Sequence, residues 1–94
     1  MKFMKTILVS YDLKAPGKDY SKLGEHLRSY DDYRKPLESF WLLKTSQTAI
    51  VVRDAVKRYI DINDKLLVID VTGDEAAWTT TIPGEISKWI KENL

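Results

Sequence analysis

The sequence of 94 residues contains no cysteine. This absence excludes disulfide bonds, thiolate metal sites and cysteine nucleophiles, and it fits a cytoplasmic protein. No apolar stretch approaches the roughly 20 residues that cross a bilayer, so we expect a soluble protein with no membrane partner. The apolar run behind the charged first residues is too short and too strand-like for a signal peptide.

The chain also lacks an excess of charge of either sign, since its formal net charge is only +1. Such a balance provides no overall attraction to nucleic acid. Two local groups of cations could still meet phosphates. They are Arg53, Lys57 and Arg58 on one predicted helix, and Arg34, Lys35 and Lys44 around a predicted strand. The more common arrangement for such residues is a solvated helix face balanced by acids, here Asp54 and Asp61.

No internal repeat, low-complexity tract or long linker divides the sequence. A chain of this length can bury one core without metals or crosslinks. We therefore predict a single domain over residues 1–94, with its core over 5–72 and a C-terminal strand and helix as an appendage over 76–94.

The stretch 5–13 is the part that the rest of the chain surrounds. Its apolar, β-branched residues give way to a carboxylate and then to a loop with Pro16 and Gly17, which predicts a buried central strand. Alternation assigns one face to Ile7, Val9 and Tyr11 and the other to Leu8, Ser10 and Asp12. We expect helices to cover the first face, which leaves Asp12 on a face that stays open or meets a second copy. A carboxylate there can coordinate a hard cation, act as a base or cap the next turn.

Further elements follow from periodicity and turn residues. Helical spacing predicts a helix over 20–30, with His26 on its polar side as an ordinary surface histidine. The run 33–45 reads as extended, and Pro36 assigns its early part to a sheet edge, before a turn near Glu38 and Ser39. The stretch 40–43 is apolar on both faces and belongs inside.

The second half contains a second helix with an apolar face from Ala49 to Ile60, which Ser46 can cap. The β-branched run 50–52 would also allow a strand over 48–52, but the apolar face continues too far for a strand. A strand over 65–72, a short fifth strand over 76–82 and a closing helix behind Pro83 complete the prediction. The two tryptophans of this region, Trp78 and Trp89, either help an assembly or close the core of the monomer.

This order of elements predicts an α+β protein with a ferredoxin-like βαββαβ sandwich, extended by a C-terminal strand and helix. We expect the first strand to lie between the third and the fourth, parallel to the third and opposed to the fourth. Three positions should then approach one end of the sheet, namely Asp12, the pair Thr45 and Ser46, and the pair Asn63 and Asp64. Asp70 should lie at the far end.

Three features resemble a known family. They are the stretch Leu8-Val9-Ser10-Tyr11-Asp12-Leu13, the stretch Leu37-Glu38-Ser39-Phe40-Trp41-Leu42 behind a helix, and the extra strand expected over 76–82. The pattern is similar to that of the small CRISPR-associated proteins of the spacer-acquisition complex and of the related virulence-associated protein D group. In that family the aspartate that ends the first strand, here Asp12, is proposed to face its twin across a dimer axis and to hold a divalent metal for phosphodiester hydrolysis.

The resemblance implies a homodimeric, nucleic-acid-associated protein and a metal-dependent endonuclease acting on RNA or DNA. Asp12 of both subunits would hold Mg²⁺, because opposed carboxylates repel unless a cation lies between them. Ser10 and Ser39 would be the supporting polar groups of the catalytic set. The alternative is a non-catalytic dimeric binding or adaptor module, in which Asp12 only shapes a turn and edge strands make the assembly. A small-molecule sensor on the open sheet face has no specific sequence feature in its favour.

Overall fold

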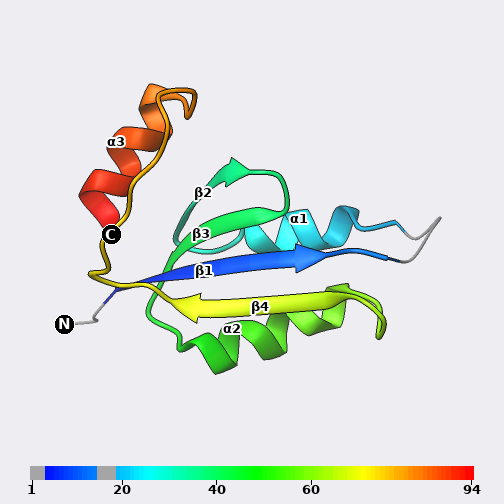
Figure 1. Ribbon diagram of the computed structural model, residues 1–94. Coiled ribbons are helices and arrows are strands. Elements are labelled where there is room, and N and C mark those ends of the chain that lie inside the picture. The colour runs from blue at the N-terminus through cyan, green and yellow to red at the C-terminus, as the bar shows by residue number, and fades with distance from the viewer. Residues whose placement is uncertain (1–3, 15–18) are drawn as a thin grey trace.

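The computed structural model of this protein describes residues 4–14 and 19–94, so the predicted loop with Pro16 and Gly17 lies outside the described residues. The described residues form an α+β structure around one antiparallel sheet (Figure 1). The strands are β1 (Lys5–Asp12), β2 (Asp32–Leu37), β3 (Phe40–Thr45) and β4 (Lys65–Asp70). The helices are α1 (Ser21–Leu27), α2 (Ala49–Val56), the 3₁₀ helix η1 (Lys57–Tyr59) and α3 (Gly84–Asn93).

The strands lie in the order β2-β3-β1-β4, which confirms the expected central position of β1. The prediction that β1 runs parallel to β3 is wrong, because Lys5 pairs with Thr45 in an antiparallel register. The helix α2 carries the chain from the end of β3 back to the start of β4. These two strands therefore run in the same direction, and β1 lies between them antiparallel to both.

The corrected direction of β3 changes which residues share an end of the sheet. Asp12 pairs with Lys65, so the turn that contains Asp64 lies near Asp12, as expected. Asp70 pairs with Ile7 toward the opposite end, also as expected. Thr45 lies at that opposite end too, so the prediction that Thr45 and Ser46 approach Asp12 is wrong.

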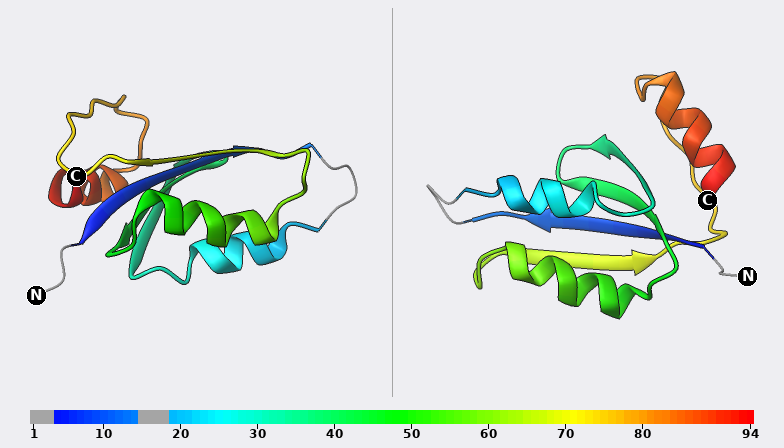
Figure 2. Two further views of the ribbon diagram at one scale, coloured as in Figure 1. Left: turned by 90° about the horizontal axis from the view of Figure 1, so that it is seen from below. Right: turned by 180° about the vertical axis from the view of Figure 1, so that it is seen from behind.

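Helices α1 and α2 cover one face of the sheet, as alternation along β1 predicted (Figure 2). Ile7 and Val9 are fully buried there, and Tyr11 packs against the same cluster. We call this cluster the helix-side core; its buried members are Ile7, Val9, Leu23, Leu27, Trp41, Leu43, Val52 and Val56. The Tyr11 hydroxyl accepts a hydrogen bond of 2.9 Å from Trp41 Nε1, so the polar end of this tyrosine is satisfied inside the layer.

The start and end of the second helix differ from the prediction. Thr48, not Ser46, is the N-cap residue, and its Oγ1 accepts a hydrogen bond of 3.3 Å from the Val51 amide. The α-helix ends at Val56, and η1 continues the chain only to Tyr59. Ile60 is already extended, with a φ of −122°, so the predicted apolar face runs past the end of regular α-helix.

The other sheet face carries a second cluster, the C-terminal core. Its buried residues are Leu42, Trp89 and Ile90, surrounded by the partly buried Leu8, Phe40, Val71, Trp78, Ile86 and Leu94. The predicted closing helix is confirmed as α3. Trp89 is buried within the monomer, which decides between the two roles left open for it.

The predicted fifth strand over 76–82 is wrong, because this part of the described chain forms no strand. It passes over the open face of the sheet as an irregular segment (Figure 2). Trp78 Nε1 donates a hydrogen bond of 2.9 Å to Ser87 Oγ, so a side chain ties the segment to α3 where backbone pairing was expected. The third feature of the family resemblance is therefore absent from the described residues. None of the described helices is long and apolar enough to cross a membrane.

Candidate functional site

Asp12 ends β1 on the face opposite Ile7 and Val9, beside its cross-strand neighbour Lys65. Its side chain is 54% exposed, and its Oδ2 lies 3.3 Å from the Nζ of Lys14, which is 58% exposed. An ion pair so open to water contributes only about 0–1 kcal/mol. The Asp12 carboxylate is therefore accessible to a ligand.

Ser10 and Ser39 meet at the same end of the sheet. Ser10 Oγ donates a hydrogen bond of 3.1 Å to the Ser39 carbonyl oxygen, which also accepts one of 3.2 Å from the Tyr11 amide. Ser39 has a φ of 54°, a left-handed conformation at the turn between β2 and β3. Ser10 and the Ser39 backbone thus fasten this turn to β1, and the Ser39 contribution comes from its carbonyl group.

Whether Mg²⁺ could bind at Asp12 depends on which other carboxylates lie nearby. Asp64 Oδ1 accepts a hydrogen bond of 2.7 Å from the Lys14 amide, and Asp64 Oδ2 accepts one of 2.8 Å from the Tyr20 hydroxyl. Asp64 therefore links the turn before β4 to Lys14, which follows β1, and to Tyr20, which precedes α1. Within residues 4–14 and 19–94, no group of three or more histidine, aspartate and glutamate side chains could hold a metal ion. Asp12 thus offers one carboxylate per subunit, and a second subunit, phosphate and water would have to supply the other ligands.

The cations around β2 and β3 make contacts with other groups of the same chain. Arg34 bonds two carboxylates, described below, and Lys44 Nζ donates hydrogen bonds of 2.9 Å to Thr6 Oγ1 and 2.8 Å to the Asn93 carbonyl oxygen. Lys35 Nζ lies 5.6 Å from the centre of the Trp41 ring. This group of cations is therefore largely occupied by contacts within the chain.

The cations of α2 and η1 are more accessible. Arg53 is exposed, and among the residues that the structure describes it pairs with its neighbour Asp54 alone, at 2.9 Å. Lys57 and Arg58 are exposed and belong to no ion pair among the described residues. Of the two groups of cations that the sequence suggested, this group is the more accessible to a phosphate.

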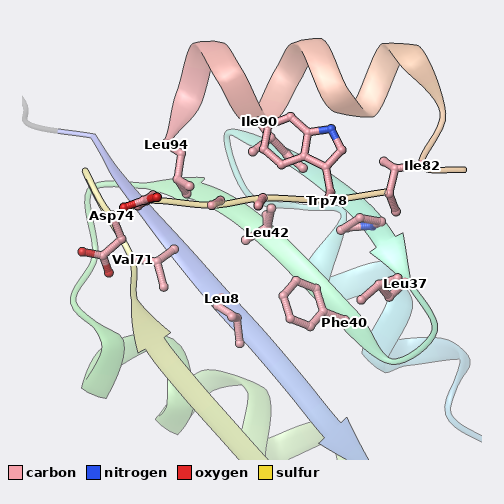
Figure 3. A pocket seen from close by; sticks show the side chains of 14 residues that line it. Leu8, Leu37, Phe40, Leu42, Val71, Asp74, Trp78, Ile82, Ile90 and Leu94 are labelled. Atoms are coloured by element: carbon pink, nitrogen blue, oxygen red, sulfur yellow. The ribbon is translucent and has the colours of Figure 1, made fainter. Parts of the chain in front are cut away.

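An apolar groove of about 310 Å³ lies on the open sheet face beneath the segment 71–82 (Figure 3). Its walls include Leu8, Phe40 and Leu42 from the sheet and Trp78, Ile82, Ile90 and Leu94 from the C-terminal part. Asp74 and Glu75 also line it. No sequence signal identified this groove, because its walls come from segments far apart in the chain.

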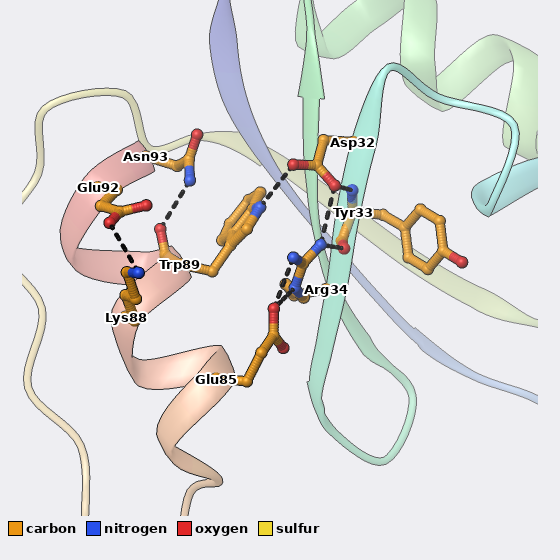
Figure 4. A network of polar contacts seen from close by, with 8 residues as sticks. All are labelled: Asp32, Tyr33, Arg34, Glu85, Lys88, Trp89, Glu92 and Asn93. Atoms are coloured by element: carbon orange, nitrogen blue, oxygen red, sulfur yellow. Dashed lines mark hydrogen bonds and ion pairs between the residues drawn. The ribbon is translucent and has the colours of Figure 1, made fainter.

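A polar network fastens α3 to the edge strand β2 (Figure 4). Trp89 Nε1 donates a hydrogen bond of 2.8 Å to Asp32 Oδ2, and Arg34 lies 2.8 Å from Asp32 Oδ1 and 2.6 Å from Glu85 Oε1. We call Asp32, Arg34, Glu85 and Trp89 the Asp32 network. The Trp89 hydrogen bond, followed by bonds from the Tyr33 amide and Arg34, lowers the pKa of Asp32. Glu85 first and Asp32 second raise the pKa of Arg34.

His26 is partly buried, so its predicted place on an open polar side of the helix is wrong. Its ring stacks on Tyr59 with centroids 4.8 Å apart and meets the edge of Tyr30 at 5.1 Å. Its Nε2 lies 3.0 Å from the Tyr30 hydroxyl. Burial, and secondarily Arg58, lowers the pKa of His26. These contacts identify His26 as a packing residue between α1 and η1.

The chain matches no protein-family model, and no solved structure gives a significant match. The resemblance to the CRISPR-associated and virulence-associated proteins therefore stays a prediction from short sequence stretches.

Proposed function

We propose that this protein has a ferredoxin-like fold and acts as a homodimeric module that associates with nucleic acid, RNA or DNA. Support for the fold comes from the element order and from the strand order β2-β3-β1-β4 with every neighbour antiparallel. The single observation that favours the homodimer most is the exposed edge formed by β4. It is an edge strand, and its side chains Leu67 and Ile69 are 57% and 42% exposed. Edge strands of this kind attract another chain unless they are covered.

Support for nucleic acid comes from the exposed cations Arg53, Lys57 and Arg58 on the helix layer. Neutralising phosphates releases counterions, so such binding weakens steeply as salt rises. With a net charge of +1 the affinity must come from a local cationic surface. A dimer supplies two copies of that surface.

Sedimentation at micromolar concentration tests the homodimer, and we expect the mass of two chains. Fluorescence anisotropy with labelled single-stranded RNA and DNA tests binding. Replacing Lys57 and Arg58 together by alanine should weaken binding and reduce the salt slope by about 1 to 2. The matched control is Lys88→Ala, whose side chain on α3 is 77% exposed. A monomer across the micromolar range, or equal binding by both variants, contradicts the proposal.

A second candidate function is a Mg²⁺-dependent endonuclease that uses Asp12. The observation that favours it is an accessible carboxylate flanked by Lys14 and the exposed Lys65. Mg²⁺ would polarise the phosphate and lower the pKa of a bound water, while the two lysines would attract the phosphate backbone. Asp12 of both subunits would hold the metal, with Ser10 and Ser39 keeping the adjacent turn in place.

Cleavage assays with Mg²⁺ or Mn²⁺ on RNA and DNA test this second function. Asp12→Ala should abolish cleavage and leave the dimer intact, whereas Asp74→Ala removes an exposed carboxylate elsewhere and should leave cleavage unchanged. Equal cleavage by the wild-type protein and Asp12→Ala would identify a contaminant. The binding module would then stand alone.

A further inference from the structure

The edge strand β4 presents a row of backbone groups that no described strand pairs with. On its inner side, the Val71 amide donates a hydrogen bond of 2.9 Å to the Thr6 carbonyl oxygen, just beyond the β1–β4 ladder. Hydrogen-bonded and non-hydrogen-bonded pairs alternate along an antiparallel ladder. Every second residue of β4 therefore turns its N–H and C=O away from the sheet, namely Leu66, Val68 and Asp70.

The side chains of β4 differ between its two faces. Leu67 and Ile69 lie on the open sheet face and are exposed, whereas Leu66 and Val68 lie under the helices and are partly buried. Asp70 shares the helix-side face with Leu66 and Val68, because it lies two residues after Val68. An exposed edge with two apolar side chains on one face suits a partner strand of the same pattern.

We infer that the homodimer forms by antiparallel pairing of β4 with β4 of a second copy, across a two-fold axis through Val68. This inference rests on the proposed homodimer and names its interface. Outward-facing residues must pair with outward-facing residues, so a register centred on Val68 sets Leu66 opposite Asp70 of the partner subunit. The same register sets Leu67 opposite Ile69 of the partner subunit, twice by symmetry, so four exposed apolar side chains cover one another.

The neighbouring register is less favourable. A two-fold axis through Leu67 would set Asp70 opposite Asp64 of the partner subunit, and like charges directly opposite are destabilising. The register centred on Val68 avoids this contact.

Charge complementarity favours the same register. Beside Leu66 lies a hollow of about 560 Å³, whose lining includes the cations Arg53 and Lys57. Asp61 and Asp64 also line this hollow, and both accept backbone N–H groups of the loop. Because Leu66 lies opposite Asp70 of the partner subunit, on the face that α2 covers, the partner's carboxylate arrives beside Lys57, which forms no ion pair among the described residues. Arg53 already pairs with Asp54, and Asp70 lies 3.5 Å from Lys5 Nζ of its own chain in a half-exposed pair that is open to a second cation.

The edge-paired dimer has a consequence for the candidate functions. Asp12 lies next to Lys65, at one end of β4, and the two-fold axis sends Asp12 of the partner subunit to the opposite end. In this dimer the two carboxylates are too far apart to share a metal, so edge pairing argues against the second candidate function. Both helix layers lie on the same side of the joined sheet, so the exposed Arg58 of both subunits lies on one face, and Lys57 lies beside the partner's Asp70 at the seam. This arrangement suits a binding module.

The absence of cysteine allows a clean crosslinking experiment. Hydrogen-bonded pairs across antiparallel strands have Cα atoms about 5.5 Å apart, which a disulfide can span. Val68→Cys should therefore crosslink to itself under mild oxidation. A mixture of Leu67→Cys and Ile69→Cys should crosslink, while each of these variants alone should not. Ile50→Cys is the control, because Ile50 is 63% exposed on α2 and lies away from β4.

Sedimentation of two further variants separates the outcomes. Leu67→Lys should weaken dimerisation by about tenfold or more, whereas the control Ile50→Lys should not change it. A dimer without the 67–69 crosslink overturns this inference and leaves the proposed homodimer standing. A monomer overturns both. A dimer that crosslinks through Asp12→Cys, and not through Val68→Cys, overturns edge pairing and favours the arrangement in which two Asp12 residues face each other.

Discussion

The two faces of the sheet are closed in different ways. The helix-side core has two helices over it, and residues such as Ile7, Leu43 and Val52 have no exposed surface. The C-terminal core has one helix and an irregular segment, and most of its members are only partly buried. The second face also borders an apolar groove of about 310 Å³.

This difference indicates that the helix-covered face contributes most of the stability, whereas the other face retains exposed surface for partners. On the helix side, apolar contacts form most of the layer, and the hydrogen bond from Trp41 to Tyr11 is made within it. On the other side, the Asp32 network fixes the position of α3 through hydrogen bonds and ion pairs, and Leu67 and Ile69 beyond it remain exposed. Directional polar contacts can hold an element in place over a small core, and they leave the rest of the face available.

The strongest test of this difference between the two faces uses two adjacent residues of β3 whose side chains point to opposite faces. Leu43→Ala removes a fully buried side chain from the helix-side core and should lower the free energy of unfolding by about 2–5 kcal/mol. Leu42→Ala acts on the C-terminal core, which can relax toward the groove, and should cost less, about 2 kcal/mol, at the low end of the same range. Urea denaturation measures both, and an equal or larger loss for Leu42→Ala would show that the second core is as tightly closed as the first.

A smaller effect is expected from the polar contact that holds α3. Trp89→Phe keeps an aromatic ring in the C-terminal core but removes the N–H that donates to Asp32, and should cost about 1–2 kcal/mol. Amide exchange should become faster in α3 and stay unchanged in β1. Trp78→Phe is the matched control, because it removes a bond to the neutral Ser87 hydroxyl and should cost about 0.5–1 kcal/mol. Equal losses of unfolding free energy in both variants would mean that the charge of Asp32 does not strengthen its hydrogen bond with Trp89.

Local patterns carried most of what could be predicted. Alternation along β1 identified the helix-covered face and located Asp12 at the strand end, because period-2 patterns are read within one segment. Pro36 placed β2 at the edge for an equally local reason. The segment 76–82 misled the prediction, since its tryptophan and three threonines favour strands, yet it is tied to α3 through side chains.

Contacts between segments far apart in the chain could not be predicted from local sequence patterns. The Asp32 network joins residues more than fifty positions apart in the chain, and neither Arg34 nor Trp89 carries a local sign of its partner. The same is true of the groove and of His26, whose aromatic neighbour Tyr59 belongs to another helix. Ser46 and Thr48 are both good N-cap residues, so only the path of the chain decides between them.

The pH dependence of stability should separate the two faces further. The pKa of Asp32 is lowered in the folded protein, so its contribution is present above the ordinary value of 3.8 and is lost as the pH falls through the folded pKa. Asp32→Asn should remove this part of the acid sensitivity. Amide exchange of α3 at pH 5 and pH 3 measures it, and an unchanged acid profile in Asp32→Asn would assign the sensitivity to other carboxylates.

The smallest effect should come from His26, on the helix-covered side. Burial and Arg58 lower its pKa in the folded protein, so the unfolded chain, with a value near 6.5, binds the proton first. Stability should therefore be full above pH 6.5 and decline as the pH falls through the lowered pKa. His26→Phe keeps a ring against Tyr59 and cannot titrate, so its denaturation midpoint should stay flat from pH 7 to about pH 5, within the range where only histidine ordinarily changes charge. A midpoint that still falls in His26→Phe over this range would mean that the helix layer owes its acid response to another group.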